Sequence, residues 1–172
     1  MSLRFLLPLC ILFSNTFSVF CQEDKILSAS QDFFTYYQQK DSVKLNALFI
    51  PQTAFWDYLN HSYIMGNLND SLAARSKNQQ YQLHQSWWKD IKLSWQKASD
   101  LYKIKWEGIQ NVEYVVKYEE RSSSGFMFQS YTVTISFQYK KNKYFIVVDG
   151  FVPIGEKVCL LANGMEIKST KY

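Results

Sequence analysis

Asp57 and His61 are the residues of this sequence whose types and spacing fit acid–base catalysis. They are four positions apart, which places them on one side of a helix and also on one face of a strand. A carboxylate that orients an imidazole makes a general base, because histidine titrates near neutral pH and its partner fixes the tautomer. No nucleophile, oxyanion donor loop or metal shell accompanies the pair in the sequence. We therefore favour an ordinary surface pair and keep Asp57 and His61 as the catalytic candidates.

Tryptophan side chains offer a second kind of chemistry, the stacking of a sugar or another planar ligand. Trp87 follows Leu83 and precedes Ile91 at helical steps of four, so we predict that it lies in the core. Trp88 points elsewhere on that helix and is the first ligand-binding candidate. Trp56, beside the acidic candidate in Phe55-Trp56-Asp57, is the second.

Metal and cofactor chemistry finds no support in the sequence. The chain has only two histidines, and Cys159 is the one cysteine outside the N-terminal segment, so a His-rich or Cys-based zinc site is excluded. Among six glycines there is no Gly-x-Ser-x-Gly elbow, phosphate-binding loop or dinucleotide fingerprint. The net charge of +4 is mild and spread along the chain, which argues against nucleic acid. We expect no metal and no cofactor.

The N-terminus has the order of a secretory signal peptide. A basic start that contains Arg4 precedes the apolar residues 5–13, and a mixed polar segment follows to Cys21. Pro8 interrupts the apolar run, which is shorter than the roughly 20 residues of a membrane-spanning helix. We predict a signal peptide over 1–21, cleavage near Cys21 and Gln22, and a secreted or periplasmic protein without a membrane span. Phe20, rather than a small residue, stands immediately before Cys21, which disfavours a lipoprotein.

The first half of the remaining chain predicts helices. Residues 24–40 carry an apolar stripe at helical intervals, with Ser30 in one of its places. A short helix is predicted over 42–49, capped by Asp41 or Ser42 and ended before Pro51. A long helix is predicted from a cap at residue 69 or 70 to about residue 99. Residues 53–65 fit a helix or the start of a strand equally well.

The second half predicts antiparallel strands. Large residues fall on even positions from Tyr102 to Tyr118 and on odd positions from Tyr131 to Tyr139, with Gly108 as a bend or bulge. Residues 140–143 form a hairpin tip before residues 144–151, a strand apolar on both faces and therefore central. Asn163-Gly164 predicts a terminal hairpin between 158–161 and 165–167. The fold class is α+β, with N-terminal helices packed on one face of a curved antiparallel sheet, in a single domain over 22–172.

This order resembles the nuclear transport factor 2-like superfamily. The resemblance covers most of residues 24–154 and rests on these segments: Lys40-Asp41-Ser42, Ala47-Leu48-Phe49, Pro51, Phe55-Trp56-Asp57, and the lysine-rich hairpin that leads to Lys143-Tyr144-Phe145-Ile146-Val147-Val148-Asp149-Gly150-Phe151. It implies a cone whose open end holds an apolar ligand, in a superfamily where some members are enzymes and many bind or assemble. No catalytic residue can be carried over.

Aromatic residues make up 17% of the chain, which is enough to build a core and a pocket from rings. We expect a non-catalytic domain that binds a small apolar or planar ligand, or a protein partner, through an aromatic concavity. The alternative is a small cofactor-independent enzyme of the isomerase or hydratase type that uses Asp57 and His61.

Overall fold

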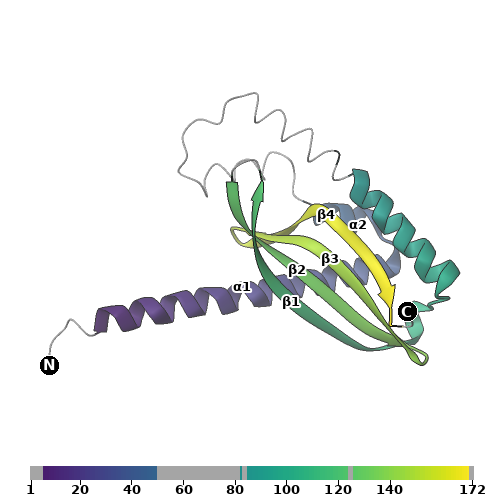
Figure 1. Cartoon of the computed structure of the whole chain (residues 1–172), viewed down its shortest axis with the longest axis horizontal. Helices are drawn as coiled ribbons and strands as arrows, with labels where there is room; N and C mark the ends of the chain where they lie inside the picture. Colours follow the sequence, from purple (N-terminus) through teal and green to yellow (C-terminus); the bar gives the residue numbers. More distant parts are fainter. Residues whose placement is uncertain (1–5, 50–81, 83–84, 124–125, 171–172) are drawn as a thin grey trace.

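The computed structural model describes residues 6–49, 82, 85–123 and 126–170, and within them the side chains of 22–49, 82, 85–120, 129–161 and 164–170. Helices come first and four strands follow, so the predicted α+β class is confirmed (Figure 1). The elements are α1 (Leu6–Gln39), α2 (Ser42–Ala47), a helix over 85–96, the π-helical turn η2 (Lys97–Leu101), the 3-10 turn η3 (Trp106–Gly108), β1 (Ile109–Ser123), β2 (Phe126–Tyr139), β3 (Asn142–Ile154) and β4 (Lys157–Ser169).

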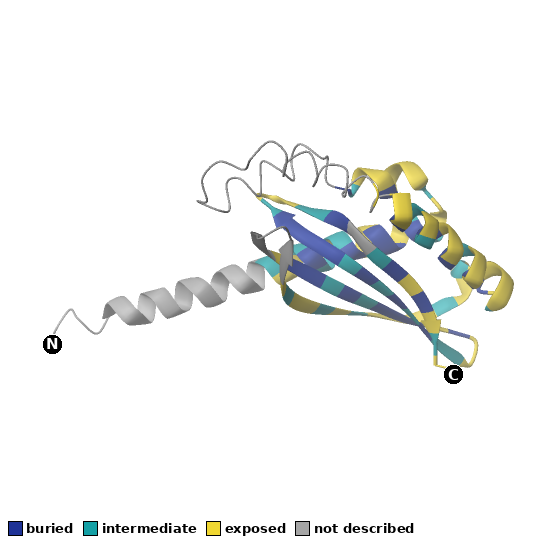
Figure 2. Ribbon diagram, turned by 45° about the horizontal axis from the view of Figure 1, so that its top comes forward, coloured by how far each residue is buried: buried dark blue, intermediate teal, exposed yellow. Residues whose placement is uncertain are grey.

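The four strands form one antiparallel meander in the order β1-β2-β3-β4. Its register aligns Val116, Val133, Val148 and Met165 in one row across the sheet. Tyr131, Val133, Ile135, Phe137 and Tyr139 are all buried, as the period of two predicts for β2. The prediction that residues 144–151 are central is also confirmed, because β3 lies between β2 and β4. Figure 2 shows the buried residues alternating along the strands.

Helix α1 lies across the buried face of the sheet and contacts all four strands. Ile26, Phe33, Phe34 and Tyr37 are buried, as their helical spacing predicts. Ser30 shares this stripe, and its hydroxyl donates a hydrogen bond of 2.7 Å to the carbonyl of Leu27. The helix satisfies this buried polar group locally, so the stripe remains compatible with an apolar core.

The N-terminal part of α1, dark purple in Figure 1, projects beyond the sheet. The helix is continuous through the position predicted for signal cleavage, between Cys21 and Gln22. Among the residues that the structure describes, no helix is both long enough and apolar enough to cross a membrane.

Helix α2 follows after a short turn and has the predicted cap. The Asp41 carboxylate accepts a hydrogen bond of 3.0 Å from the backbone N–H of Lys44. Leu45, within α2, is fully buried. Directly after α2, the carbonyl of Leu48 accepts a 2.7 Å hydrogen bond from the backbone N–H of Leu160 in β4. Phe49 thereby forms a parallel bridge with Leu160.

The helix over 85–96 packs against α1 through Trp87, whose ring meets that of Phe33, and Trp87 and Ile91 are both fully buried. This helix confirms the part of the long predicted helix that falls after residue 84, and the helical turns continue through η2 to Leu101. The first part of that prediction, and residues 53–65, lie outside the described residues.

The prediction of a strand from Tyr102 is wrong, because β1 begins only at Ile109. Trp106 lies in η3, where its ring packs edge-on against Tyr37 with 5.6 Å between centroids. The packing of this partly buried ring stabilises a turn, although the period of two indicates an extended chain. Gly108 ends the turn, and the irregular register lies between Gln110 and Glu113.

The predicted terminal hairpin at Asn163-Gly164 is also wrong. β4 runs without a turn from Lys157 to Ser169, and Gly164 pairs with Asp149 of β3. The turn lies earlier, at Gly155, which has φ +58°. Gly164 has φ +142° opposite an irregularity in β3, so its freedom serves a bulge within the ladder.

Candidate functional site

Three of the four predicted site residues, Asp57, His61 and Trp56, lie outside the described residues. The fourth, Trp88, is half-buried, and its ring meets that of Trp87 edge-on with 5.6 Å between centroids. It packs against the core as well as reaching the surface. The structure therefore brings Trp88 together with the core tryptophan and leaves its ligand-binding role a prediction.

Trp87 has the core position predicted for it. Its ring meets Phe49 edge-on at 4.0 Å between centroids and Phe33 at 6.2 Å. Phe33 in turn contacts Tyr37 and Phe151 at 6.0 and 6.2 Å. These rings fill the space between α1, the helix over 85–96 and the sheet, so this part of the aromatic content builds the core.

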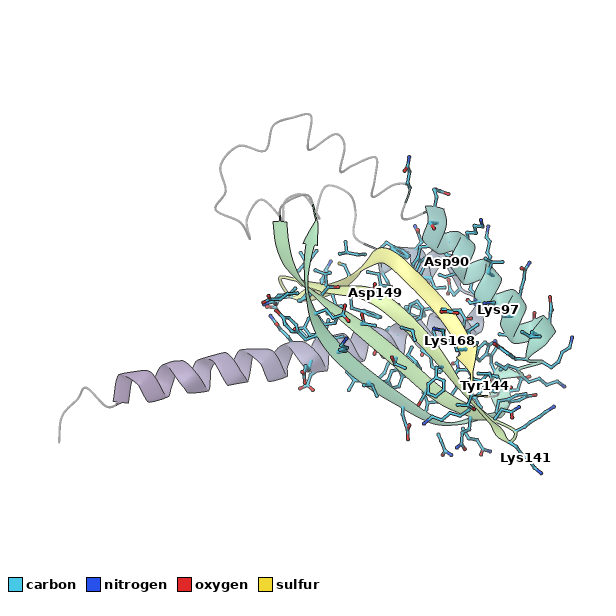
Figure 3. All side chains as sticks on the ribbon, viewed as in Figure 1. Asp90, Lys97, Lys141, Tyr144, Asp149 and Lys168 are labelled. Atoms are coloured by element: carbon cyan, nitrogen blue, oxygen red, sulfur yellow. The ribbon has the colours of Figure 1, made fainter. Side chains whose placement is uncertain are left out.

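A groove of about 480 Å³ lies between the helix over 85–96 and the second half of β4. In Figure 3, Asp90 and Lys97 lie on the helical side of this groove, while Asp149 and Lys168 lie on the sheet. We call this feature the β4 groove. Its lining consists of Asp90, Leu93, Ser94, Lys97, Val147, Asp149, Gly164, Met165, Glu166, Ile167 and Lys168.

The helical wall of the β4 groove follows from spacing in the sequence. Asp90, Leu93, Ser94 and Lys97 stand at intervals of three and four, which places them on one face of the helix. Leu93 is 45% exposed, so it presents an apolar surface to the groove between two charged side chains.

Buried hydrogen bonds anchor this wall to α1. The hydroxyl of Tyr37 donates to Ser94 Oγ at 2.9 Å, and Ser94 Oγ donates to the carbonyl of Ile91 at 2.7 Å. Trp95 Nε1 donates to the carbonyl of Tyr37 at 3.0 Å. Burial raises the pKa of Tyr37, so its hydroxyl remains a donor throughout the ordinary pH range.

The sheet wall is the free edge of β4. From Gly164 to Lys168 the strand pairs with β3 on one side. On its other side, no main-chain hydrogen bond is formed with any residue that the structure describes. The same edge is occupied nearer its start, where Leu160 bonds to Leu48. An edge with unpaired N–H and C=O groups is a template for another extended chain.

Charges of both signs surround the groove. The Lys168 ammonium lies 2.9 Å from the Glu166 carboxylate, and both side chains are more than half exposed. Asp149 Oδ1 accepts a 2.9 Å hydrogen bond from Thr132 Oγ1. The exposed ion pair between Lys168 and Glu166 contributes little to stability, so both groups can exchange partners with a ligand. The groove is therefore suited to polar recognition around an apolar centre.

The described residues hold no group of three or more His, Cys, Asp or Glu side chains that could bind a metal ion. Cys159 is a free, half-buried thiol outside the groove, and burial raises its pKa. Neither feature adds catalytic chemistry to the β4 groove.

Sequence reasoning missed the β4 groove. The sequence shows the helical spacing of Asp90, Leu93 and Lys97. That spacing does not indicate a groove until β4 is known to lie at a sheet edge beside the helix. The predicted turn at Gly164 divided β4 into two short strands that pair with each other, so one long strand beside the helix was not expected.

The resemblance to the nuclear transport factor 2-like superfamily stays a prediction. No protein-family model matches the chain, and no curated protein or solved structure matches it either.

Proposed function

We propose that this chain is an exported, non-catalytic domain that binds an extended segment of a protein partner in the β4 groove. The observation that carries this proposal is the edge of β4 from Gly164 to Lys168, which no other described strand pairs with, and which has a helix as the opposite wall. A groove between a strand edge and a helix is suited to strand addition, in which main-chain hydrogen bonds provide affinity.

Side chains around that edge supply selectivity. Leu93 and Met165 offer apolar contacts, and alternate residues of an added strand would point toward them. Lys97 and Glu166 lie at opposite walls, so charged residues of the partner meet a complementary group on either side. Among the described residues, no aromatic side chain lines the β4 groove, which favours a peptide over a planar small molecule.

The proposal is tested by selecting a displayed library of random peptides on the wild-type protein. We expect enriched peptides that bind wild type and lose at least about tenfold in affinity with Leu93→Asp, since a carboxylate replaces the apolar centre of the groove. Amide exchange should slow at alternate residues of 165–168 when such a peptide is bound, because the N–H groups that point away from β3 become hydrogen-bonded.

Leu101→Asp is the matched control. Leu101 is also an exposed leucine, at 67%, and lies just beyond the same helix but outside the groove. Its substitution should leave peptide binding unchanged. Peptides that bind Leu93→Asp and wild type equally, or that leave exchange at residues 165–168 unaltered, would refute the proposal.

A further inference from the structure

The second edge of the sheet, β1, carries an unusual concentration of exposed apolar side chains. Val112, Val115 and Tyr118 are 38%, 62% and 44% exposed, and they are three of the six exposed large hydrophobic residues in the described part of the chain. From Glu113 to Lys117, the main chain of β1 pairs with β2 on one side and, among the described residues, with no strand on the other. Edge strands of monomers usually avoid this combination.

The spacing of these residues is symmetric about Val115. Val112 and Tyr118 stand three positions to either side, and Glu113 and Lys117 stand two positions to either side. In an antiparallel pair centred on one residue, positions at equal distance from the centre face each other. A second copy of β1 would therefore place valine opposite valine at the centre, carboxylate opposite ammonium, and Val112 opposite Tyr118.

We propose that two copies of this chain pair antiparallel through β1, with Val115 of each copy opposite Val115 of the other. The sheet then continues from one copy into the next. Each dimer contains two contacts between Glu113 and Lys117 of different copies, and it covers all three exposed apolar residues of the strand.

The charged groups that this register requires are accessible. The side chains of Glu113 and Lys117 are 63% and 74% exposed. Glu113 also accepts hydrogen bonds from Lys143 and Ser136, both at 3.1 Å, which hold its carboxylate on the outer face of the sheet. The regular register of β1 starts at Glu113, so Val112 stands at the end of the proposed strand pair, next to the irregularity.

The proposed interface leaves the β4 groove open, because β1 and β4 are opposite edges of the sheet (Figure 1). A single strand pair buries less surface than a standard interface, so the dimer should be weak and dependent on concentration. Because the dimer uses β1 and peptide binding uses β4, a test of the dimer succeeds or fails independently of the proposed function.

The test is sedimentation equilibrium on the purified chain, with its N-terminus identified by intact mass. We expect the mass to rise from one copy, 20.3 kDa for the full chain, toward two copies between about 1 and 500 µM. Lys117→Glu should raise the dissociation constant by about tenfold, because both ionic contacts become repulsive. The combined Glu113→Lys and Lys117→Glu exchange should restore it to within about threefold.

Lys168→Glu is the matched control, since it makes the same charge change on β4 and should leave the mass unchanged. Val115→Lys, which places two ammonium groups at the centre, should give a monomer, and circular dichroism should verify that each variant is folded. A wild-type chain that stays at the mass of one copy to 500 µM would overturn the proposal. So would dimers of Val115→Lys, or a charge exchange without rescue.

Discussion

Phe33→Ala should be strongly destabilising, because Phe33 joins three layers of the structure. The Phe33 ring is fully buried and touches a ring from each neighbouring layer: Tyr37 on its own helix, Trp87 on the helix over 85–96, and Phe151 on β3. It therefore links α1, the helical wall of the β4 groove and the sheet.

The magnitude follows from burial and from these contacts. Truncating a buried phenylalanine to alanine costs about 3–5 kcal/mol through lost transfer energy and the cavity left behind. Three aromatic partners place Phe33 in the upper half of that range, at about 4 kcal/mol. At about 3 °C per kcal/mol for a chain of this size, the melting temperature should fall by about 12 °C.

Equilibrium unfolding in urea, followed by tryptophan fluorescence, measures this loss directly. Thr35→Ala is the control, because Thr35 lies on the same helix and is exposed, so its substitution should change stability by less than about 0.5 kcal/mol. If Phe33→Ala loses less than about 1.5 kcal/mol with an unchanged m value, the ring does not join the three layers and our reasoning is wrong.

Gly164→Ala should lower stability by about 1–3 kcal/mol in a urea titration. The cause is φ +142° and not crowding, since nothing lies within 4 Å of the added carbon; an unchanged midpoint would contradict this. The backbone N–H of Lys44 lowers the pKa of Asp41, so the stability that Asp41 contributes is present above the unfolded value of 3.8 and is lost as pH falls through the lower folded pKa. Asp41→Asn should therefore flatten the stability profile below about pH 4, and an identical profile would argue against the cap. Mass analysis of the exported protein should find Gln22 at or near the N-terminus, and an intact Met1 would refute the predicted signal peptide.

Sequence patterns determined the class of fold and much of the core. The stripe of Phe33, Phe34 and Tyr37 identified the buried face of α1, and the alternation from Tyr131 to Tyr139 identified the buried face of β2. Such patterns are readable because the period of a helix or a strand is a property of the local chain. The cap at Asp41 was readable for the same reason, since its hydrogen bond spans only three residues.

The candidate site was less accessible to sequence reasoning. Trp88 was the one described residue chosen as a ligand candidate, and it packs partly on the core. Leu93 and Glu166 line the β4 groove, but no local sequence pattern distinguishes them. They form one site only because the helix and β4, which are distant in sequence, lie side by side.

Only the tertiary structure decided where the strands begin, turn and end. Trp106 lies in a turn because Tyr37, far away in sequence, offers its ring a packing partner. Asn163-Gly164 has the composition of a hairpin turn, but β3 supplies Gly164 with a strand partner in Asp149, so pairing along β4 outweighs the local preference. The strand order leaves β1 and β4 as the two edges of the sheet. A strand can be identified as an edge only when the pairing of every strand is known. Local spacing therefore specified the elements, whereas non-local pairing and packing specified the surfaces on which they can act.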